Sequence, residues 1–236
     1  MMNKMFKFDG SSSDVNFCLG HRRRLKKKFL LSPKSFLDYE ILEMLLFSIF
    51  SRKDTKIIAK DLIKKFGTLK AVIFASEQEI KKIPGLGEST AVFFKLLRET
   101  FMRLSLQPLK EETIIASNLH VIEYYRNLLS LEKREQFRVM FINNKNKLIA
   151  EEQLQQGTID QTPIYPREVI QRALDHGASA IILVHNHPSG SPYPSKEDID
   201  VTKNLNSVIQ QINLRLLDHI IIAENSSYSF AEHHLL

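Results

Sequence analysis

The sequence predicts an all-α N-terminal domain followed by a C-terminal α/β domain built on a mixed β-sheet. Up to about residue 106, apolar residues recur at helical spacing and no strand pattern interrupts them. Beyond this point, short apolar runs typical of strands alternate with helical segments. The charge changes at the same place, because residues 1–110 hold 22 Lys or Arg against 11 Asp or Glu, whereas residues 111–236 hold 11 against 16. A basic half joined to an acidic half suggests two tasks, and a polyanion is the expected partner of the basic half.

The N-terminal half is expected to begin with a flexible tail, residues 1–19, and to continue as a helical domain, residues 20–106. Asp54 is placed to cap one of its helices and Gly67 to end the same helix. Pro108 and the charges around it predict a linker at residues 107–112. The helices expected in this half span residues 22–31, 35–50, 54–66, 77–82 and 89–104.

A turn with the sequence IPGLG, residues 83–87, lies between the last two of these helices. Two glycines allow a tight turn and a close approach of a partner, and Leu86 between them is expected to pack inward. The next helix then turns its free N–H groups towards any anion that approaches. The turn resembles the helix-hairpin-helix motif, although a helix–helix corner without a ligand has the same pattern. The resemblance implies contacts to the DNA backbone, without reading of bases, through Lys81, Lys82, Gly85, Gly87 and Ser89.

The C-terminal half, residues 113–236, is expected to wrap helices around one mixed sheet. An Asn- and Lys-rich turn at residues 143–147 joins its first two strands into a hairpin. Pro166 is expected to open a helix that Gly177 ends. The helices expected here span residues 117–129, 166–176 and 195–212, and the strands span residues 137–142, 148–154, 178–185, 214–223 and 228–230.

The segment from His185 to Asp198 has the pattern of a metal site. His185 ends an apolar strand and His187 follows two residues later, so alternation turns both rings to the same side. Both can reach one zinc ion, which binds nitrogen at about 2.0–2.1 Å. Asp198 arrives from the first turn of the next helix, and three protein ligands with an open fourth position are typical of a catalytic zinc. Ser195 and Asp198 also fit a helix cap with an acidic first turn, which needs no metal.

This pattern resembles the JAMM motif of MPN-domain metalloproteases: His-x-His, seven residues, Ser, two residues and Asp. The wider sequence resembles the bacterial RadC family, whose members are named for DNA repair. The resemblance implies a JAB1/MPN-like sandwich with a cytidine-deaminase-like layout for the C-terminal domain. It also leaves open a non-enzymatic accessory role in DNA repair or recombination, in which the metal serves the structure. The segments that carry it span residues 20–25, 38–43, 157–158, 166–168, 185–198, 217–222 and 228–233.

The chemistry implied by the JAMM resemblance is amide hydrolysis of an unknown protein or peptide. Zn²⁺ would lower the pKa of a water molecule to near 7 and polarise the scissile carbonyl. In JAMM proteases a glutamate near the first strand of the hairpin moves the proton to the leaving amine, which implies Glu135 as the general base. Glu151 and Glu152 on the returning strand remain alternatives. Ser195 is expected to donate to the oxyanion of the tetrahedral intermediate.

Composition excludes several other classes. The only cysteine is Cys18, so an internal disulfide is excluded, and so is the Pro-Cys-x-x-Cys zinc site of the nucleobase deaminases. A two-metal nuclease needs more carboxylates than the motif supplies. Residues 1–18 do not resemble a signal peptide and no segment resembles a membrane span, so a cytoplasmic protein is expected. His219, within an apolar strand, is expected to be structural or to support a ligand.

Overall fold

The structure is a computed structural model that describes residues 12–51, 53–111, 113–114, 118–156 and 165–236. The chain forms two compact units, Met1–Glu99 and Thr100–Leu236. Within the described ranges, no helix is both long enough and apolar enough to cross a membrane.

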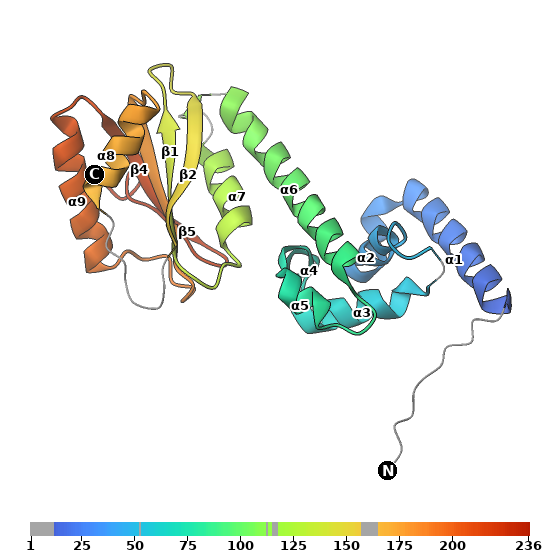
Figure 1. Cartoon of the computed structure of the whole chain (residues 1–236). Helices are drawn as coiled ribbons and strands as arrows, with labels where there is room; N and C mark the ends of the chain where they lie inside the picture. The colour runs from blue at the N-terminus through green and yellow to red at the C-terminus, as the bar shows by residue number, and fades with distance from the viewer. Residues whose placement is uncertain (1–11, 52, 112, 115–117, 157–164) are drawn as a thin grey trace, which may run out of the picture. The chain divides into compact units, whose positions relative to one another are not determined.

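The N-terminal unit is helical, as predicted (Figure 1). Its first helix begins at Ser12, so the boundary expected at residue 19 for the tail matches no element boundary, and residues 1–11 of that tail lie outside the described residues. The short helix α4 was not expected. The helices are α1 (Ser12–Leu31), the 3-10 helix η1 (Pro33–Ser35), α2 (Asp38–Leu46), α3 (Thr55–Phe66), α4 (Leu69–Phe74), α5 (Glu77–Lys81) and the first part of α6 (Glu88–Glu111).

The apolar positions of these helices meet in one core, and polar residues at the helix ends fix their limits. Asp54 accepts a hydrogen bond from the Lys56 N–H at 2.9 Å, and Gly67, with a φ of 86°, ends α3, which confirms both predictions. In the turn before α6, Gly85 has a φ of 82° and Leu86 is buried, as expected. The completely buried core residues are Leu42, Leu46, Ala59, Leu62, Val72 and Ile80.

Helix α6 extends further than predicted. It continues through Pro108 to Glu111, so residues 107–111 are helical rather than a linker. Proline in the last turn of a helix removes one backbone hydrogen bond. Met102 and Leu109, on one face of the same helix, are both buried, and this packing outweighs the lost bond.

The C-terminal unit is a mixed five-stranded sheet with the strand order β2-β1-β3-β4-β5 (Figure 1). Only the β3–β4 pair is parallel, and the other three neighbouring pairs are antiparallel. The predicted α/β class with a mixed sheet is therefore confirmed. The strands are β1 (Gln136–Ile142), β2 (Leu148–Gln156), β3 (Ala180–Asn186), β4 (Arg215–Ile222) and β5 (Ser227–Ser229), and the helices are α7 (Asn118–Leu129), α8 (Pro166–Asp175) and α9 (Lys196–Gln210).

Helices cover both faces of this sheet. Helices α8 and α9 pack on one face and α7 on the other (Figure 1). Strand β3 is buried along its whole length, which explains its continuous apolar sequence. Helix α9 is the crossover that joins the parallel strands β3 and β4. Its N-terminus therefore lies at the end of β3, where ligands commonly bind in α/β sheets.

Candidate metal centre

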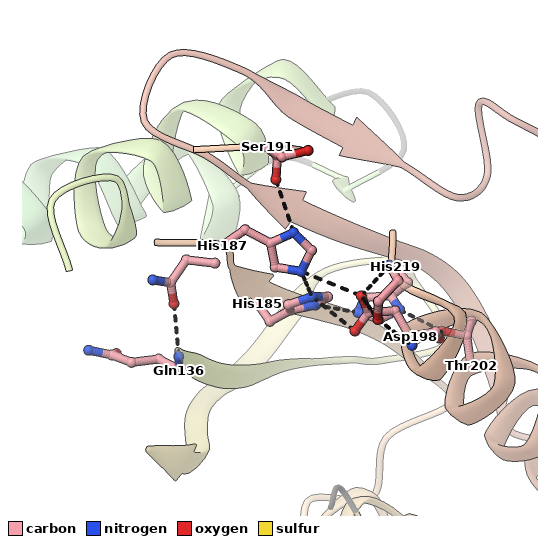
Figure 2. Close-up of polar contacts among 9 residues, drawn as sticks. Gln136, His185, His187, Ser191, Asp198, Thr202 and His219 are labelled. Carbon is pink, nitrogen blue, oxygen red and sulfur yellow. Dashed lines mark hydrogen bonds and ion pairs between the residues drawn. The ribbon is translucent and has the colours of Figure 1, made fainter. Parts of the chain in front are cut away.

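The three predicted ligands come together where β3 ends and α9 begins (Figure 2). The N–H of His187 donates to the carbonyl of Ile222 at 2.9 Å, so strand pairing continues one residue beyond β3. Alternation then places the rings of His185 and His187 on the same face of the sheet, towards Asp198 in the first turn of α9. One ligand atom from each residue lies within 4.8 Å of the other two.

The distances among these atoms suit a single small cation. The Nε2 atoms of His185 and His187 are 2.9 Å apart, and they lie 3.2 and 3.4 Å from the nearest oxygens of Asp198. A tetrahedral ion with bonds of about 2.0–2.1 Å holds its ligand atoms roughly 3.3 Å apart. Two imidazole nitrogens and the Asp198 carboxylate, whose Oδ1 lies nearest His185 and whose Oδ2 lies nearest His187, are therefore spaced for one zinc-sized ion.

Ser195 holds the carboxylate of Asp198 in place. The Ser195 N–H and O–H both donate to Oδ2 of Asp198, at 2.8 and 2.6 Å, and the Asp198 N–H donates to the Ser195 hydroxyl at 3.0 Å. This reciprocal pair caps α9. Capping and ligation are compatible, because Oδ1 of Asp198 stays directed at His185. The role of Ser195 as a donor to an oxyanion stays a prediction.

The charges of the site are strongly coupled. Burial opposes ionisation of Asp198, yet hydrogen bonds with His185 and His187 hold the pKa of this carboxyl well below its usual range. Burial likewise opposes protonation of His187, but Asp198 and the Ser191 carbonyl raise its pKa. Because a carbonyl oxygen only accepts, Nδ1–H of His187 donates to Ser191 at 3.0 Å, and Nε2 is left to face the other ligands.

A family model described as a RadC-like JAB domain matches residues 115–235. This match covers just over half of the chain and includes every residue of the ligand set. The chain belongs to the RadC family. The resemblance read from the motif is thereby confirmed for the C-terminal unit, whose mixed sheet and helices have the JAB-type arrangement. The match does not reach the N-terminal helices, so the helix-hairpin-helix resemblance stays a prediction.

In this RadC-family domain, His219 contacts His185, one of the predicted ligands. It is completely buried in β4, with its Nε2 at 2.8 Å from Nδ1 of His185 and its Nδ1 at 2.6 Å from the Thr202 hydroxyl. Its ring stacks on the ring of Phe230, with 4.7 Å between the two ring centroids. Burial is the main reason that the pKa of His219 lies well below its usual value.

Asn186, between the two histidine ligands, is not among the predicted site residues. Asn186 is 1% exposed, and its side chain accepts the Gln136 N–H at 2.8 Å and donates to the Arg134 carbonyl at 3.0 Å. A longer contact of 3.4 Å reaches the Glu132 carbonyl. Asn186 therefore fixes the backbone on both sides of Glu135. The sequence feature that could have indicated this role is a single amide side chain at the end of an apolar strand, which alternation directs to the face opposite the two histidines.

Glu135 lies beside the metal centre. It is exposed, it directly precedes β1, and its charge contributes to the raised pKa of His187. The second residue of β1, Phe137, pairs with His185 in the sheet. The start of β1 and the end of β3 are therefore adjacent, and Glu135, the predicted general base, lies at the same corner of the domain as the predicted ligands.

The two alternative bases are held elsewhere. Glu151 accepts hydrogen bonds from Arg138 at 2.5 and 3.1 Å. Glu152 is bound by Arg172 and His176, and the bond from Arg172 is the main reason that its pKa is lowered to about 2. Both glutamates pair with the middle of β1 rather than with its start. Each is thus engaged in an ion pair and lies further along the sheet than Glu135.

The residues predicted to contact DNA all belong to the N-terminal unit, whereas the predicted metal ligands belong to the C-terminal unit. Lys81 forms an ion pair with Glu77, one turn earlier in α5. The remaining four are exposed around the turn that precedes α6: Lys82, Gly85, Gly87 and Ser89.

Proposed function

We propose that this chain is a metal-dependent amide hydrolase of the JAMM class and that His185, His187 and Asp198 hold Zn²⁺. The observation that carries the proposal is the convergence of two imidazole nitrogens and one carboxylate within 4.8 Å. This donor set is typical of catalytic zinc sites, which keep a fourth position for water or substrate. Softer or larger ions suit it less well, because thiolates or additional oxygens are lacking among the three ligands.

A bound zinc supplies a nucleophile at neutral pH and polarises a carbonyl. Glu135 is proposed to take the proton of the attacking water and to deliver it to the leaving amine. Its exposure beside His187 allows a substrate to approach it. Ser195 is proposed to donate to the developing oxyanion. This requires its hydroxyl to rotate away from Asp198, whose Oδ2 keeps the hydrogen bond from the Ser195 backbone N–H.

Metal analysis of the purified full chain tests the ligand set. We expect one zinc per chain in the unaltered protein and none in His185→Ala, His187→Ala or Asp198→Ala. The matched control is His233→Ala, because His233 is an exposed histidine near the C-terminus. Equal zinc content in a ligand variant and in the control would refute the site.

Hydrolysis is tested separately with Glu135→Gln. This variant is expected to bind zinc normally and to lose cleavage of the peptide and isopeptide substrates found by an unbiased search for products. The matched control is Glu232→Gln, because Glu232 is exposed near the C-terminus and lies outside the metal centre. Undiminished cleavage by Glu135→Gln would assign the proton transfer to another group.

We further propose that the basic N-terminal half contacts the DNA backbone near the turn before α6. Residues 1–110 carry 22 basic against 11 acidic side chains, and Lys82 is exposed beside Gly85 at this turn. Lys82→Glu should weaken binding to duplex DNA and reduce its salt dependence, whereas Lys145→Glu, in an exposed turn of the other unit, should not. If Lys82→Glu abolishes biological function and Glu135→Gln does not, the accessory role in DNA repair is favoured over hydrolysis.

A further inference from the structure

A buried row of hydrogen bonds lies behind the metal ligands (Figure 2). Nδ1 of His185 is 2.8 Å from Nε2 of His219, and Nδ1 of His219 is 2.6 Å from the hydroxyl of Thr202. That hydroxyl is 2.5 Å from the backbone carbonyl oxygen of Asp198. His185, Thr202 and His219 are between 0 and 5% exposed, so water has little access to this row, and each contact within the row needs one proton between its two atoms.

The direction of every bond in the row follows from its last member. The Asp198 carbonyl can only accept, so the single hydroxyl proton of Thr202 is donated to it. Thr202 must then accept from Nδ1–H of His219. A neutral imidazole carries one proton, so Nε2 of His219 accepts from Nδ1–H of His185. Nε2 of His185 is then the ring atom that faces His187 and Asp198.

We infer that Thr202 is a positioning residue that acts through His219 to hold His185 in the tautomer whose Nε2 is free to bind a metal ion. This inference rests on the proposed metal site but is independent of hydrolysis. It predicts that both His185 and His219 carry their proton on Nδ1. The free side chain in water prefers the opposite tautomer, with the proton on Nε2, so the protein must enforce this state.

A neutral His219 is required by its surroundings. The ring is completely buried and stacked on Phe230, and its two nitrogens contact His185 and Thr202 rather than a carboxylate. A second proton on this ring would place a charge in the interior without a hydrogen-bonded acid beside it. It would also turn Nε2 of His219 into a donor, which would leave His185 with its proton on the metal side.

The row and the Ser191 carbonyl together prepare the centre for a cation. Ser191 holds a proton on Nδ1 of His187, and Thr202, acting through His219, holds one on Nδ1 of His185, so the Nε2 atoms of both rings face the carboxylate of Asp198, where a cation would replace any proton that they carry. Three acceptors that converge within 4.8 Å are stabilised by a positive charge between them. Thr202 also lies one helical turn after Asp198, so a single hydroxyl couples a nitrogen ligand to the backbone of the oxygen ligand.

Long-range ¹⁵N–¹H NMR of the metal-free full chain near neutral pH measures these tautomers directly. We expect the Nδ1–H form for both His185 and His219. Thr202→Val keeps the shape but removes the acceptor, so His219 should shift to the Nε2–H form. His185 should follow it, and zinc affinity measured by chelator competition should fall 10- to 100-fold. Thr202→Ser should restore both readouts, and Thr55→Val, at another buried threonine in the N-terminal unit, should leave both unchanged.

Two results would overturn the inference: an Nε2–H tautomer at His185 in the unaltered protein, or unaltered tautomers and zinc affinity in Thr202→Val. The first measurement needs no variant, so it decides the question even if Thr202→Val fails to fold. Should the unaltered chain show both predicted tautomers and yet bind no zinc, the tautomer assignment stands and the proposed metal function is wrong.

Discussion

Replacement of Asn186 by alanine tests how firmly the segment around Glu135 is held. The change removes the acceptor of the Gln136 N–H, at 2.8 Å, and the donor to the Arg134 carbonyl, at 3.0 Å. Gln136 is 7% exposed, so its N–H would lose its partner where water has little access, which costs about 1–3 kcal/mol. Arg134 is exposed, and water can replace the bond to its carbonyl. We therefore expect the free energy of unfolding to fall by about 2–3 kcal/mol.

Two further variants sharpen this prediction. Asn186→Asp keeps the acceptor for Gln136 but brings a carboxylate against the carbonyl oxygens of Glu132 and Arg134, so it should destabilise at least as much as alanine. Asn143→Ala is the matched control, because the Asn143 side chain likewise makes two hydrogen bonds to the backbone, here accepting the N–H groups of Lys145 and Lys147, but in a turn that water reaches. Its cost should stay below about 1 kcal/mol.

Urea denaturation followed by far-UV circular dichroism measures the free energy of unfolding, and hydrogen exchange of the Gln136 amide reports the local effect. Protection of this amide should drop in Asn186→Ala and remain in Asn143→Ala. Equal losses of stability in the two alanine variants, or an unchanged exchange rate at Gln136, would refute the reasoning.

Three other predictions concern the pH response and the backbone. The pKa of Glu152 is about 2 rather than 4.5, chiefly because of the hydrogen bond with Arg172. The ionised carboxylate therefore contributes to the free energy of unfolding above pH 4.5, and this contribution is lost as the pH falls towards 2. Glu152→Gln should therefore reduce the change in the free energy of unfolding over this pH interval by about 1 kcal/mol, once solvent screening is allowed for. Denaturation at a series of pH values measures this change, and a pH dependence equal to that of the unaltered protein would contradict the prediction. Pro108→Ala should restore a hydrogen bond in α6 and raise the free energy of unfolding by about 1–3 kcal/mol, whereas a lower urea midpoint would show that the proline is required. Gly190→Ala should lower the free energy of unfolding, measured by thermal denaturation, by about 1–2 kcal/mol, because a φ of 86° is unfavourable for alanine even though no atom lies within 4 Å of the added Cβ. An unchanged free energy would mean that the loop adopts another conformation.

The proximity of the three predicted ligands could be predicted from the sequence because it depends only on local geometry. Strand alternation places His185 and His187 on one face, and a helix cap places Asp198 at the start of α9. The contact of His219 with His185 is different, because it depends on the pairing of β3 with β4, where Leu183 lies opposite His219. This register joins residues far apart in the sequence, and local patterns do not specify it.

The helix boundaries show a similar limit. Helix α4 has only six residues, too few for a periodic pattern. Its N-cap, Thr68, is a residue type that often caps helices, and its hydroxyl accepts the Ala71 N–H at 3.1 Å. At Pro108 the local preference predicts a break, and the burial of Leu109 in the following position overrides it. Tertiary packing, which the sequence pattern does not reveal, decides such cases.

The order in which the ligands occur along the chain has a consequence for biosynthesis. His185, His187 and Asp198 lie on one strand, one loop and the first turn of one helix, and all of them leave the ribosome before β4 and β5. If these residues hold an ion as proposed, a nascent chain could bind it while the sheet is still incomplete, and the ion would then tie β3 to its crossover helix. The contact between His219 and His185 forms only when β4 docks, so under the same proposal the addition of β4 would tighten the binding of the ion.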